Sequence, residues 1–518
     1  MILLWLIILP LAGGVISWYA GRIRTAWPRW ISLITALLLF WVSMNIWIGH
    51  YASLKEMDLH GPWVLEVRLN WIPQIGAGFH LAADGLSLIL VLLTAFLGLA
   101  AVISSWTEIK EKTGSFHLNL LWILAGIIGV FLSIDLFLFY FFWELMLVPM
   151  YFLIALWGHE NRRYASFKFF IFTQAGGLLM LIAILGLYFV HGRATGSYSF
   201  DYMELLGTPM TAGTGFWLML GFFAAFAVKL PVVPFHNWLP DAHTEAPTAG
   251  SVILAGLLLK TGAYGLIRFA VPLFPHAAAE FAPAAMIMGV VGILYGAVTA
   301  FGQTDLKRLV AYTSVSHMGF VLLGVFVWSE IALQGAVMQI ICHGVATGAL
   351  FIICGALQER IHTRDMSRMG GLWETAPRMA AAALFFALAS LGLPGLGNFV
   401  GEFLILLGAY KTNAAVASIA ATGVVAATIY SLWIVQRVFH GPNAQNWRIP
   451  DLSRRETFVI AAMIASLLWF GLFPQAVFNT SKQALKNMTV MGPKGRAEES
   501  LWLNAVTDRT NRDGGTTQ

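Results

Sequence analysis

Two lysines lie inside long apolar stretches of the sequence, where an ammonium group is costly to bury. Lys229 ends the run FWLMLGFFAAFAV and is followed at once by Pro231 and Pro234. Lys260 lies about ten residues, or about 14 Å of helix, inside the next apolar stretch, too deep for its side chain to reach an aqueous interface. A lysine desolvated in this way can gain and lose a proton near neutral pH, which is the chemistry of a proton relay.

Two carboxylates share this apolar setting. Glu144 stands in FLFYFFWELMLVPM, and we expect it to pair with Lys229, because an opposite charge within about 4 to 6 Å changes the proton affinity of both groups. Glu402 follows the glycine-rich segment LGLPGLGNFVG, whose flexible backbone favours hydration beside the carboxylate. For each glutamate the alternative is a carboxyl kept neutral in an apolar slot or hydrogen-bonded to a neighbouring helix.

Two histidines lie between Lys260 and Glu402 in the sequence, His317 and His343. A lone histidine on an apolar helix is more often a packed core residue than a proton carrier. Two on adjacent predicted spans favour the relay, since imidazole titrates near pH 6.5 and passes protons through both ring nitrogens.

Further ionisable residues crowd the segment after Lys229, namely His236, Asp241, His243 and Glu245. Their types suit a metal, but no recognised zinc spacing is present, and the prolines favour loop capping and helix starts instead. Glu108, in SSWTEIKEK, is expected at the edge of a span, either paired with Lys112 or taking part in the relay.

The sequence carries no signature of a redox centre. It has no GxGxxG after a strand, no phosphate-binding loop and no cysteine cluster, so we expect no flavin, haem, nucleotide, metal or iron-sulfur centre in this chain. Cys342 and Cys354 are twelve residues apart on one predicted helix, roughly 18 Å, which is too far for a disulfide.

The composition places these residues in a membrane protein. Of the 518 residues 58% are hydrophobic and 11% charged, and the mean hydropathy is +0.74, far too apolar for a soluble protein. About fourteen stretches are long enough to cross a hydrocarbon core of roughly 30 Å. The fold class is therefore an all-α polytopic membrane protein. The net charge of +5 is scattered in short loops, so nucleic-acid binding is excluded.

The basic residues also predict an orientation. Alternate loops hold 18 lysines and arginines on one side and five on the other, Lys55, Arg68, Arg193, Arg268 and Lys411. The lysine-rich and arginine-rich side is cytoplasmic by the positive-inside rule, which puts both termini in the periplasm. Residues 50–83 then form the longest external segment and suit a small hairpin or a cap on the membrane surface. The first span reads as a retained helix and not a cleaved signal.

Two spans are interrupted, one after Lys229 by its prolines and one before Glu402 by Pro394 and nearby glycines. Paired interruptions in two halves of a chain are typical of inverted-repeat transporters with a site near the midplane. We therefore divide the chain into segments as follows: N-terminal spans 1–117, a first repeat 118–271, a second repeat 281–440, a last span in 441–493, and a polar tail 494–518.

Several long motifs identify a family. VKLPVVPFHNWLPDAHTEAPTAGSVILAGLLLKTGAYGLIRF, QTDLKRLVAYTSVSHMGFV and LGLPGLGNFVGEF closely resemble the antiporter-like membrane subunits of respiratory complex I and of cation/proton antiporter complexes. The resemblance runs from about residue 80 to residue 440. It implies fourteen transmembrane helices, two inverted five-helix repeats, two discontinuous helices and one proton channel.

The resemblance also implies roles. Glu144 and Lys229 become a coupled ion pair, Lys260 the central relay lysine, His317 and His343 the linking groups, and Glu402 the terminal residue. The implied partners are sister antiporter-like subunits in the lipid bilayer and a peripheral arm that holds flavin mononucleotide (FMN) and iron-sulfur clusters and reduces quinone.

The sequence thus predicts a proton-translocating subunit of a respiratory complex in the bacterial inner membrane. Two alternatives remain: a cation/proton antiporter subunit that exchanges sodium with the same residues, and a purely structural membrane module.

Overall fold

The structure, a computed structural model, describes residues 1–55 and 63–490. Within these residues 13 helices are long and apolar enough to cross a membrane. One further crossing combines the shorter apolar helix Pro377–Ser390 with the helix Gly397–Thr412. The all-α membrane fold predicted from composition is therefore confirmed. The polar tail 494–518 lies outside the described residues.

The long helices are α1 (Ile2–Ala20), α2 (Trp27–Lys55), α3 (Gly85–Ser104), α4 (Thr113–Leu132), α5 (Leu136–Trp157), α6 (Arg162–Thr195), α8 (Ala212–Lys229), α13 (Pro275–Phe301), α14 (Leu306–Phe326), α15 (Glu330–Ile361), α19 (Ala414–Val438) and α20 (Arg454–Leu472). The shorter helices and the strands are β1 (Leu65–Ile72), η2 (Pro73–Ile75), β2 (Ala77–Ala83), α7 (Tyr202–Leu205), α9 (Trp238–Glu245), α10 (Thr248–Ile253), η3 (Leu254–Leu258), α11 (Leu259–Gly265), η4 (Leu266–Ala270), α12 (Val271–Leu273), η5 (Met366–Arg368), α16 (Leu372–Thr375), α17 (Pro377–Ser390), α18 (Gly397–Thr412) and α21 (Gln475–Val490).

Aspartates start several of the long helices. The carboxylate of Asp84 accepts from Ser87 N at the start of α3, that of Asp135 from two amides at the start of α5, and that of Asp305 from Arg308 N at the start of α14. Such N-caps satisfy amides that have no partner inside the helix. They fix where each span begins at the membrane surface.

The two predicted breaks are present. Helix α8 ends at Lys229, and the indole N–H of Trp238 donates to the freed carbonyl of Val228 at 2.9 Å. Between α17 and α18 the chain turns at Gly392 and Gly395, whose φ angles of +80° and +94° suit residues without a Cβ. Both breaks therefore have a local cause in proline or glycine, and both lie next to an ionisable residue.

The eighth span is also irregular, which the sequence did not predict. The segments η3 and η4, on either side of Lys260, are π-helical turns. Such turns are rare and cluster at functional sites. The span is continuous but locally widened where it carries its lysine.

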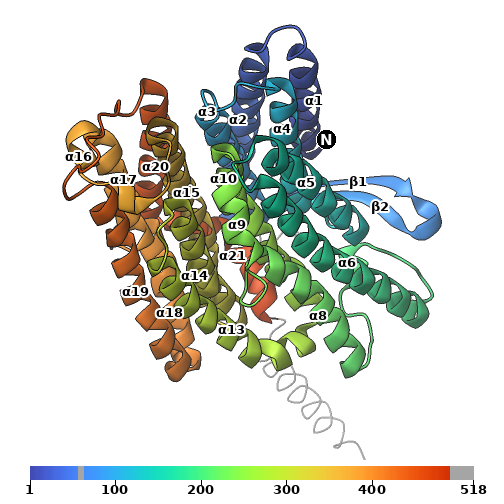
Figure 1. The fold of residues 1–518 in the computed structure, drawn as a ribbon. Coiled ribbons are helices and arrows are strands. Elements are labelled where there is room, and N and C mark those ends of the chain that lie inside the picture. Colours follow the sequence, from blue (N-terminus) through green and yellow to red (C-terminus); the bar gives the residue numbers. More distant parts are fainter. Residues whose placement is uncertain (56–62, 491–518) are drawn as a thin grey trace, which may run out of the picture.

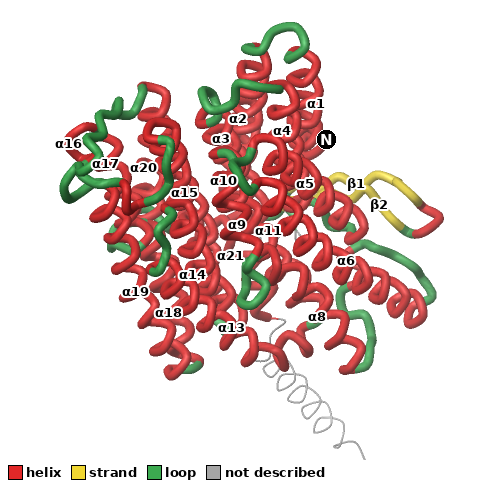
Figure 2. Tube along the Cα trace, in the orientation of Figure 1, coloured by secondary structure: helices red, strands yellow, loops and turns green. Residues whose placement is uncertain are grey.

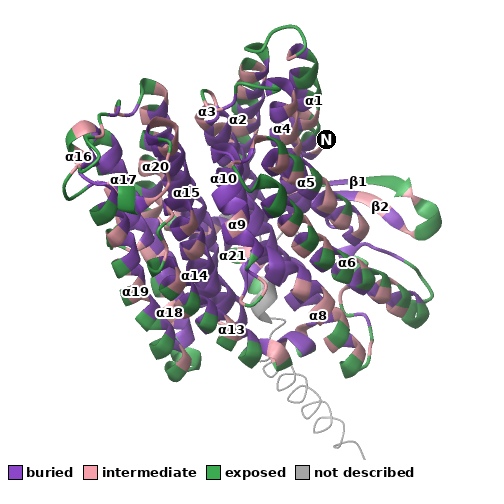
Figure 3. Cartoon of the chain, viewed as in Figure 1, coloured by how far each residue is buried: buried purple, intermediate pink, exposed green. Residues whose placement is uncertain are grey.

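The centre of the bundle is shielded from lipid. In Figure 1 the N-terminal helices, in blue, and the C-terminal helices, in orange, flank α9, α14 and α15. The apolar stretch of the span Thr248–Leu273 is 100% buried, as is that of α15. The apolar stretch of α14 is 94% buried. Figure 3 shows the same central helices in purple. Ionisable residues on these three spans are therefore surrounded by protein.

A two-stranded hairpin projects from one side of the bundle (Figure 2). Strands β1 and β2 pair antiparallel, with Arg68 opposite His80. The hairpin is tied to the loops before α5 and after α6, since Gly78 N donates to the Asp135 carboxylate at 2.8 Å and Phe200 N donates to the Gly76 carbonyl at 3.3 Å. Of the two predicted possibilities, a small hairpin or a cap, residues 63–83 form a hairpin; its external position stays a prediction, and residues 56–62 lie outside the described residues. We call this surface of the bundle the hairpin side and the other the opposite side.

Arg268 corrects one sequence prediction. It was assigned to a loop on the hairpin side, but it lies in η4 within the eighth span and is 8% exposed. The apolar residues that follow it, FAVPLF, extend the span as far as Leu273.

The broken crossing is the fourth of five in each predicted repeat. The first set runs α4, α5, α6, α8 with α9, and then the eighth span, and it starts on the opposite side. The second set runs α13, α14, α15, α17 with α18, and then α19, and it starts on the hairpin side. The boundaries 118–271 and 281–440 stay a prediction.

Candidate functional site: a buried line of ionisable groups

Lys260 contacts one of the predicted histidines directly. Its Nζ lies 2.6 Å from Nδ1 of His343 and donates to the carbonyl of Ala255 at 2.6 Å. The π-helical turn η3 presents that carbonyl to the amine. Lys260 and His343 are 0% and 1% exposed, so the pair is out of contact with water from either side of the bundle.

The second histidine continues the line to Glu402. The rings of His343 and His317 have their centroids 5.4 Å apart, and Nδ1 of His317 lies 2.8 Å from Oε1 of Glu402. These side chains come from α15, α14 and α18. Four predicted residues therefore form one row, Lys260, His343, His317 and Glu402, which we call the buried line.

Two members of this site were missed by the sequence analysis. The amide of Gln339 donates to Oε1 of Glu402 at 2.7 Å, and the hydroxyl of Tyr430 lies 3.3 Å from Nε2 of His317. Gln339 stands four residues before His343 on α15 and so shares its helix face. That spacing is a usable signal. Tyr430 has no such signal, because it comes from α19.

Lys229 and Glu144 lie apart from the buried line. Nζ of Lys229 has no hydrogen-bond partner among the described residues and lies over the rings of Trp143 and Phe169, 5.3 and 5.5 Å from their centroids. Glu144 is half-buried on α5, and it interacts with Tyr140 and Gln174. No direct ion pair joins Glu144 to Lys229, both of which are described, and the coupling expected between them over about 4 to 6 Å stays a prediction. They still act on each other electrostatically.

The two lysine-bearing helices touch at a glycine. A Cβ placed on Gly262 would lie 2.7 Å from the Phe226 carbonyl oxygen and 3.1 Å from Cβ of Lys229. Because glycine has no side chain, α8 and α11 approach closely at the level of both lysines. No hydrogen bond joins Lys229 to Lys260, so transfer between them needs water or side-chain motion.

Of the four ionisable residues after Lys229, the two acids have separate partners, whereas the ring nitrogens of His236 and His243 have no hydrogen-bond partner among the described residues. Asp241 pairs with Lys168 at 2.6 Å and with Arg308 at 3.3 Å, while Glu245 accepts from Asn161 N. The remaining two are histidines, His236 and His243; the ring of His243 stacks on Phe351. Among the described residues no three candidate ligands gather around one point. The two carboxylates mainly hold the loop between α8 and α10.

Glu108 binds the first residue of the eighth span, although the two are far apart in the sequence. Both oxygens of its carboxylate accept from Thr248 N, at 3.0 and 3.1 Å. Glu108 thus caps α10, and the predicted pairing with Lys112 is not what holds it. A carboxylate at a helix N-terminus also complements the helix dipole.

A second charged cluster lies outside the membrane spans, on the hairpin side. Nδ1 of His80 lies 2.6 Å from Asp201 and Nε2 lies 2.9 Å from Glu66, while Arg68 reaches both Asp201 and Glu204 at 3.2 Å. Burial lowers the pKa of His80, but the hydrogen bond and charge of Asp201, with Glu66, outweigh it, so the pKa is raised above 6.5. Burial raises the pKa of Asp201, but His80 and Arg68 outweigh this, so it is lowered below 3.8.

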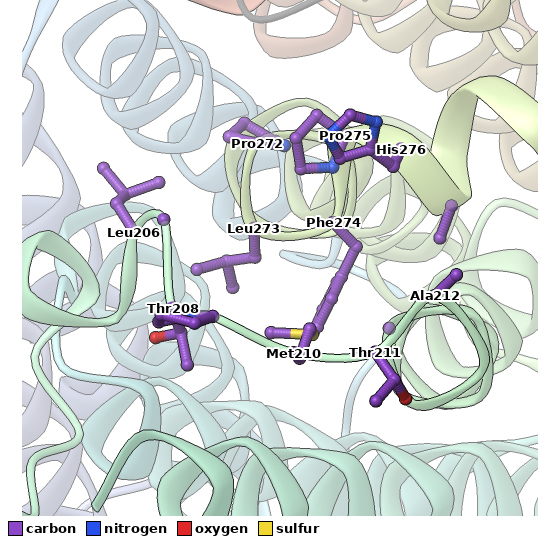
Figure 4. A pocket seen from close by; sticks show the side chains of 14 residues that line it. Leu206, Thr208, Met210, Thr211, Ala212, Pro272, Leu273, Phe274, Pro275 and His276 are labelled. Carbon is purple, nitrogen blue, oxygen red and sulfur yellow. The ribbon is translucent and has the colours of Figure 1, made fainter. Parts of the chain in front are cut away.

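The cavity drawn in Figure 4 is separate from the buried line. It measures about 530 Å³ and lies on the hairpin side, between the loop that leads into α8 and the junction of α12 with α13. Met210 and Phe274 point into it. No predicted relay residue lines it.

A bundle of membrane spans, two of them broken, that encloses a row of ionisable side chains defines an ion-translocating membrane protein. The family model described as "NADH:quinone oxidoreductase/Mrp antiporter, TM" matches residues 133–429, and the chain belongs to this family. The family resemblance read from the sequence motifs is confirmed.

Close relatives carry complex I names. NADH-quinone oxidoreductase subunit M of Escherichia coli K12 is 55% identical over 496 residues, covering 94% of this chain and 97% of the relative. The subunit of the same name in Pseudomonas aeruginosa is 55% identical over 492 residues, with the same coverage. NADH-ubiquinone oxidoreductase chain 4 of Marchantia polymorpha is 38% identical over 490 residues, also covering 94% and 97%.

Two solved structures share the fold. A chain of respiratory complex I from Thermus thermophilus with bound NADH has a TM-score of 0.85 and 32% identity, covering 95% of this chain and 100% of that one. A chain of the Mrp complex from Dietzia has a TM-score of 0.82 and 20% identity, covering 95% and 98%. At 20% identity the second likeness concerns the fold alone.

Proposed function

We propose that this chain is a proton-translocating membrane subunit of NADH-quinone oxidoreductase, as the names of its relatives suggest. The observation that carries the proposal is the buried line, in which Lys260 and Glu402 are joined through two imidazoles. A lysine, two histidines and a carboxylate can each hold or release a proton. A row of such groups shielded from lipid and from both membrane surfaces suits transfer across the midplane.

The proposed order of transfer follows the geometry. A change of charge on a neighbouring subunit alters the interaction of Glu144 with Lys229, and Lys229 releases its proton toward Lys260. From there the proton passes along the buried line to Glu402 and out. Because no ion pair holds Glu144 to Lys229, a modest electrostatic change suffices to shift the proton on Lys229.

The energy comes from outside this chain. Moving one elementary charge against 100 mV costs about 2.3 kcal/mol. The sequence has no nucleotide or cluster-binding motif, so we assign NADH oxidation, FMN, iron-sulfur clusters and quinone reduction to partner subunits. Neighbouring antiporter-like subunits flank the chain in the membrane arm.

The proposed location is the bacterial inner membrane. The loops with 18 basic residues lie on the opposite side, away from the hairpin, and the positive-inside rule assigns that side to the cytoplasm. The hairpin and the N-terminus then face the periplasm, as does the C-terminal end of α20.

The test is made in the assembled complex, reconstituted in proteoliposomes. Lys260→Ala and Glu144→Ala should each lower NADH-driven proton translocation and quinone reductase activity sharply while the complex still assembles. Lys411→Ala and Glu280→Ala remove exposed charges outside the site and serve as matched controls that keep parent rates.

Two results would contradict the proposal. Parent-level proton translocation in the Lys260 and Glu144 variants would leave the chain a structural module. Sodium exchange by the purified chain without redox partners would make it an antiporter.

A further inference from the structure

A buried ion pair joins the span that carries Lys260 to the residue that precedes α3. The guanidinium of Arg268 contacts the carboxylate of Asp84 through Nη2, and the two side chains are 9% and 3% exposed. Asp84 also caps α3 through Ser87 N, so the pair ties the hairpin-side end of α3 to the eighth span. Neither residue belongs to the buried line.

A hydrogen-bonded tyrosine extends this pair toward the midplane. Nε of Arg268 donates to the hydroxyl of Tyr264 at 3.3 Å, and that hydroxyl donates to the carbonyl of Phe131 at 3.0 Å. The hydroxyl of Ser87 lies 3.2 Å from the hydroxyl oxygen of Tyr264. Tyr264 and Ser87 are both 0% exposed. The polar groups are therefore contiguous and dry.

The spacing aligns these groups with the relay lysine. Tyr264 follows Lys260 by four residues and Arg268 follows it by eight, so the three lie on one face over about 12 Å of helix. The buried carboxylate of Asp84 ends the row at the start of α3, and the ring of Trp63 lies 5.2 Å from the guanidinium. A polar row thus runs from Lys260 to the hairpin side, away from the direction of His343.

Arginine is the one group in this row that cannot pass a proton on. Its guanidinium stays protonated in proteins, and as a fixed positive charge it repels protons, which is how pores exclude them. The guanidinium lies between the carboxylate of Asp84 and the hydroxyl of Tyr264. The row is therefore blocked by charge at the position where it would otherwise join Lys260 to water.

We propose that Arg268, held by Asp84, is an electrostatic barrier that closes the hairpin-side end of the eighth span and so directs protons from Lys260 sideways to His343. This inference rests on the proposed proton relay. Burying an ion pair is often no more stabilising than burying apolar side chains of similar volume. Stability alone therefore does not account for two charges at this place.

The test replaces both charges by amides of similar shape, Arg268→Gln with Asp84→Asn, in the complete complex in proteoliposomes. Passive proton influx under an imposed pH difference should rise at least about tenfold, which corresponds to about 1.4 kcal/mol of lost barrier. The ratio of the NADH oxidation rate with an added uncoupler to the rate without it should fall toward one. Arg268→Gln alone gives the same readout should the double variant not assemble.

Three further variants make the result specific. Arg268→Lys keeps the positive charge and should stay tight, although it loses the hydrogen-bonding fork. Lys260→Ala added to the double variant should close the leak again, because the leak passes through Lys260. The matched control removes a comparable pair from the opposite side, Arg360→Gln with Glu456→Gln, whose atoms lie 2.8 Å apart; its vesicles should stay tight.

Tight vesicles from the double variant would overturn the barrier, as would a leak that persists without Lys260 or a leak in Arg268→Lys. The proposed function fails separately, when Lys260→Ala alone leaves NADH-driven proton translocation at the parent level.

Discussion

Nδ1 of His317 lies 2.8 Å from Oε1 of Glu402, although the two residues are 85 positions apart in the sequence. Together with the 2.6 Å contact between Lys260 and His343, this makes two hydrogen-bonded pairs. The only step between the pairs is from one imidazole ring to the other, across 5.4 Å between centroids. Ring rotation or one water is enough for that step, so the buried line needs no large movement of its helices.

Removing His343 should interrupt the buried line. In His343→Leu we expect proton translocation to fall by about two orders of magnitude, the low end of what a positioned proton carrier contributes. Lys260 keeps its contact with Ala255, so the helix around it should remain in place. The measurement is NADH-driven acidification in proteoliposomes, with assembly checked by native electrophoresis. His117→Leu is the control, because His117 is equally buried but lies on α4, away from the line; an equal loss there would mean that burial, and not the relay, is what both variants disturb.

Gln339 should matter because it donates to a buried carboxylate. Gln339→Leu leaves Glu402 with one hydrogen bond fewer, and leaving a buried acceptor unsatisfied costs about 1 to 3 kcal/mol. We expect a lower temperature of thermal inactivation of the complex and a several-fold loss of proton translocation. Gln334→Leu, on the same helix but partly exposed and bonded to Glu330, should change neither. Equal effects of the two substitutions would remove Gln339 from the site.

Six ionisable residues in the interior of apolar stretches could be found from sequence because lysine, glutamate and histidine stand out in such surroundings; one of them, Glu144, is only half-buried. Lys229, Lys260, His317, His343 and Glu402 are all buried in the structure, and both breaks lie where proline and glycine predict them. Pairing was harder to foresee. Opposite charges favour contact between Glu144 and Lys229, but the aromatic rings of Trp143 and Phe169 occupy the space around the amine instead.

Other features depend on tertiary packing and leave little trace in the sequence. The π-helical turns on either side of Lys260 were not predicted from the sequence. In the sequence Arg268 suggests a loop at the end of a span. It is acceptable inside the span only because the buried carboxylate of Asp84 pairs with it. Asp84 itself reads as an ordinary helix cap. Tyr430 joins the site from a helix more than a hundred residues after His317.

Adding a methyl group at Gly262 should separate α8 from α11. The new Cβ of Gly262→Ala would lie 2.7 Å from the Phe226 carbonyl oxygen and 2.8 Å from Leu230 N, backbone atoms that cannot move independently. Overpacking of this kind costs about 1 to 3 kcal/mol, so we expect earlier thermal inactivation and slower proton translocation. Gly213→Ala meets nothing within 4 Å and should be neutral or slightly stabilising. Unchanged stability in Gly262→Ala would show that the two helices can move apart without cost.

Attachment of the hairpin should depend on pH in both directions. His80 has a raised pKa in the folded protein, so the stability it contributes is complete below pH 6.5 and is lost as the pH rises through the raised value. Asp201 has a lowered pKa, so its contribution is complete above pH 3.8 and is lost as the pH falls through the lowered value. Amide hydrogen exchange in residues 65–83, corrected for the intrinsic effect of pH, should be slowest between these limits. His80→Gln keeps one hydrogen bond but no charge, so it should abolish the loss of protection at high pH and weaken the loss at low pH, because His80 is the main cause of the lowered pKa of Asp201. His191→Gln is the matched control, since His191 is buried on the same side but binds the uncharged hydroxyl of Thr208; a high-pH loss that disappears in His191→Gln and persists in His80→Gln would rule out His80 as its cause.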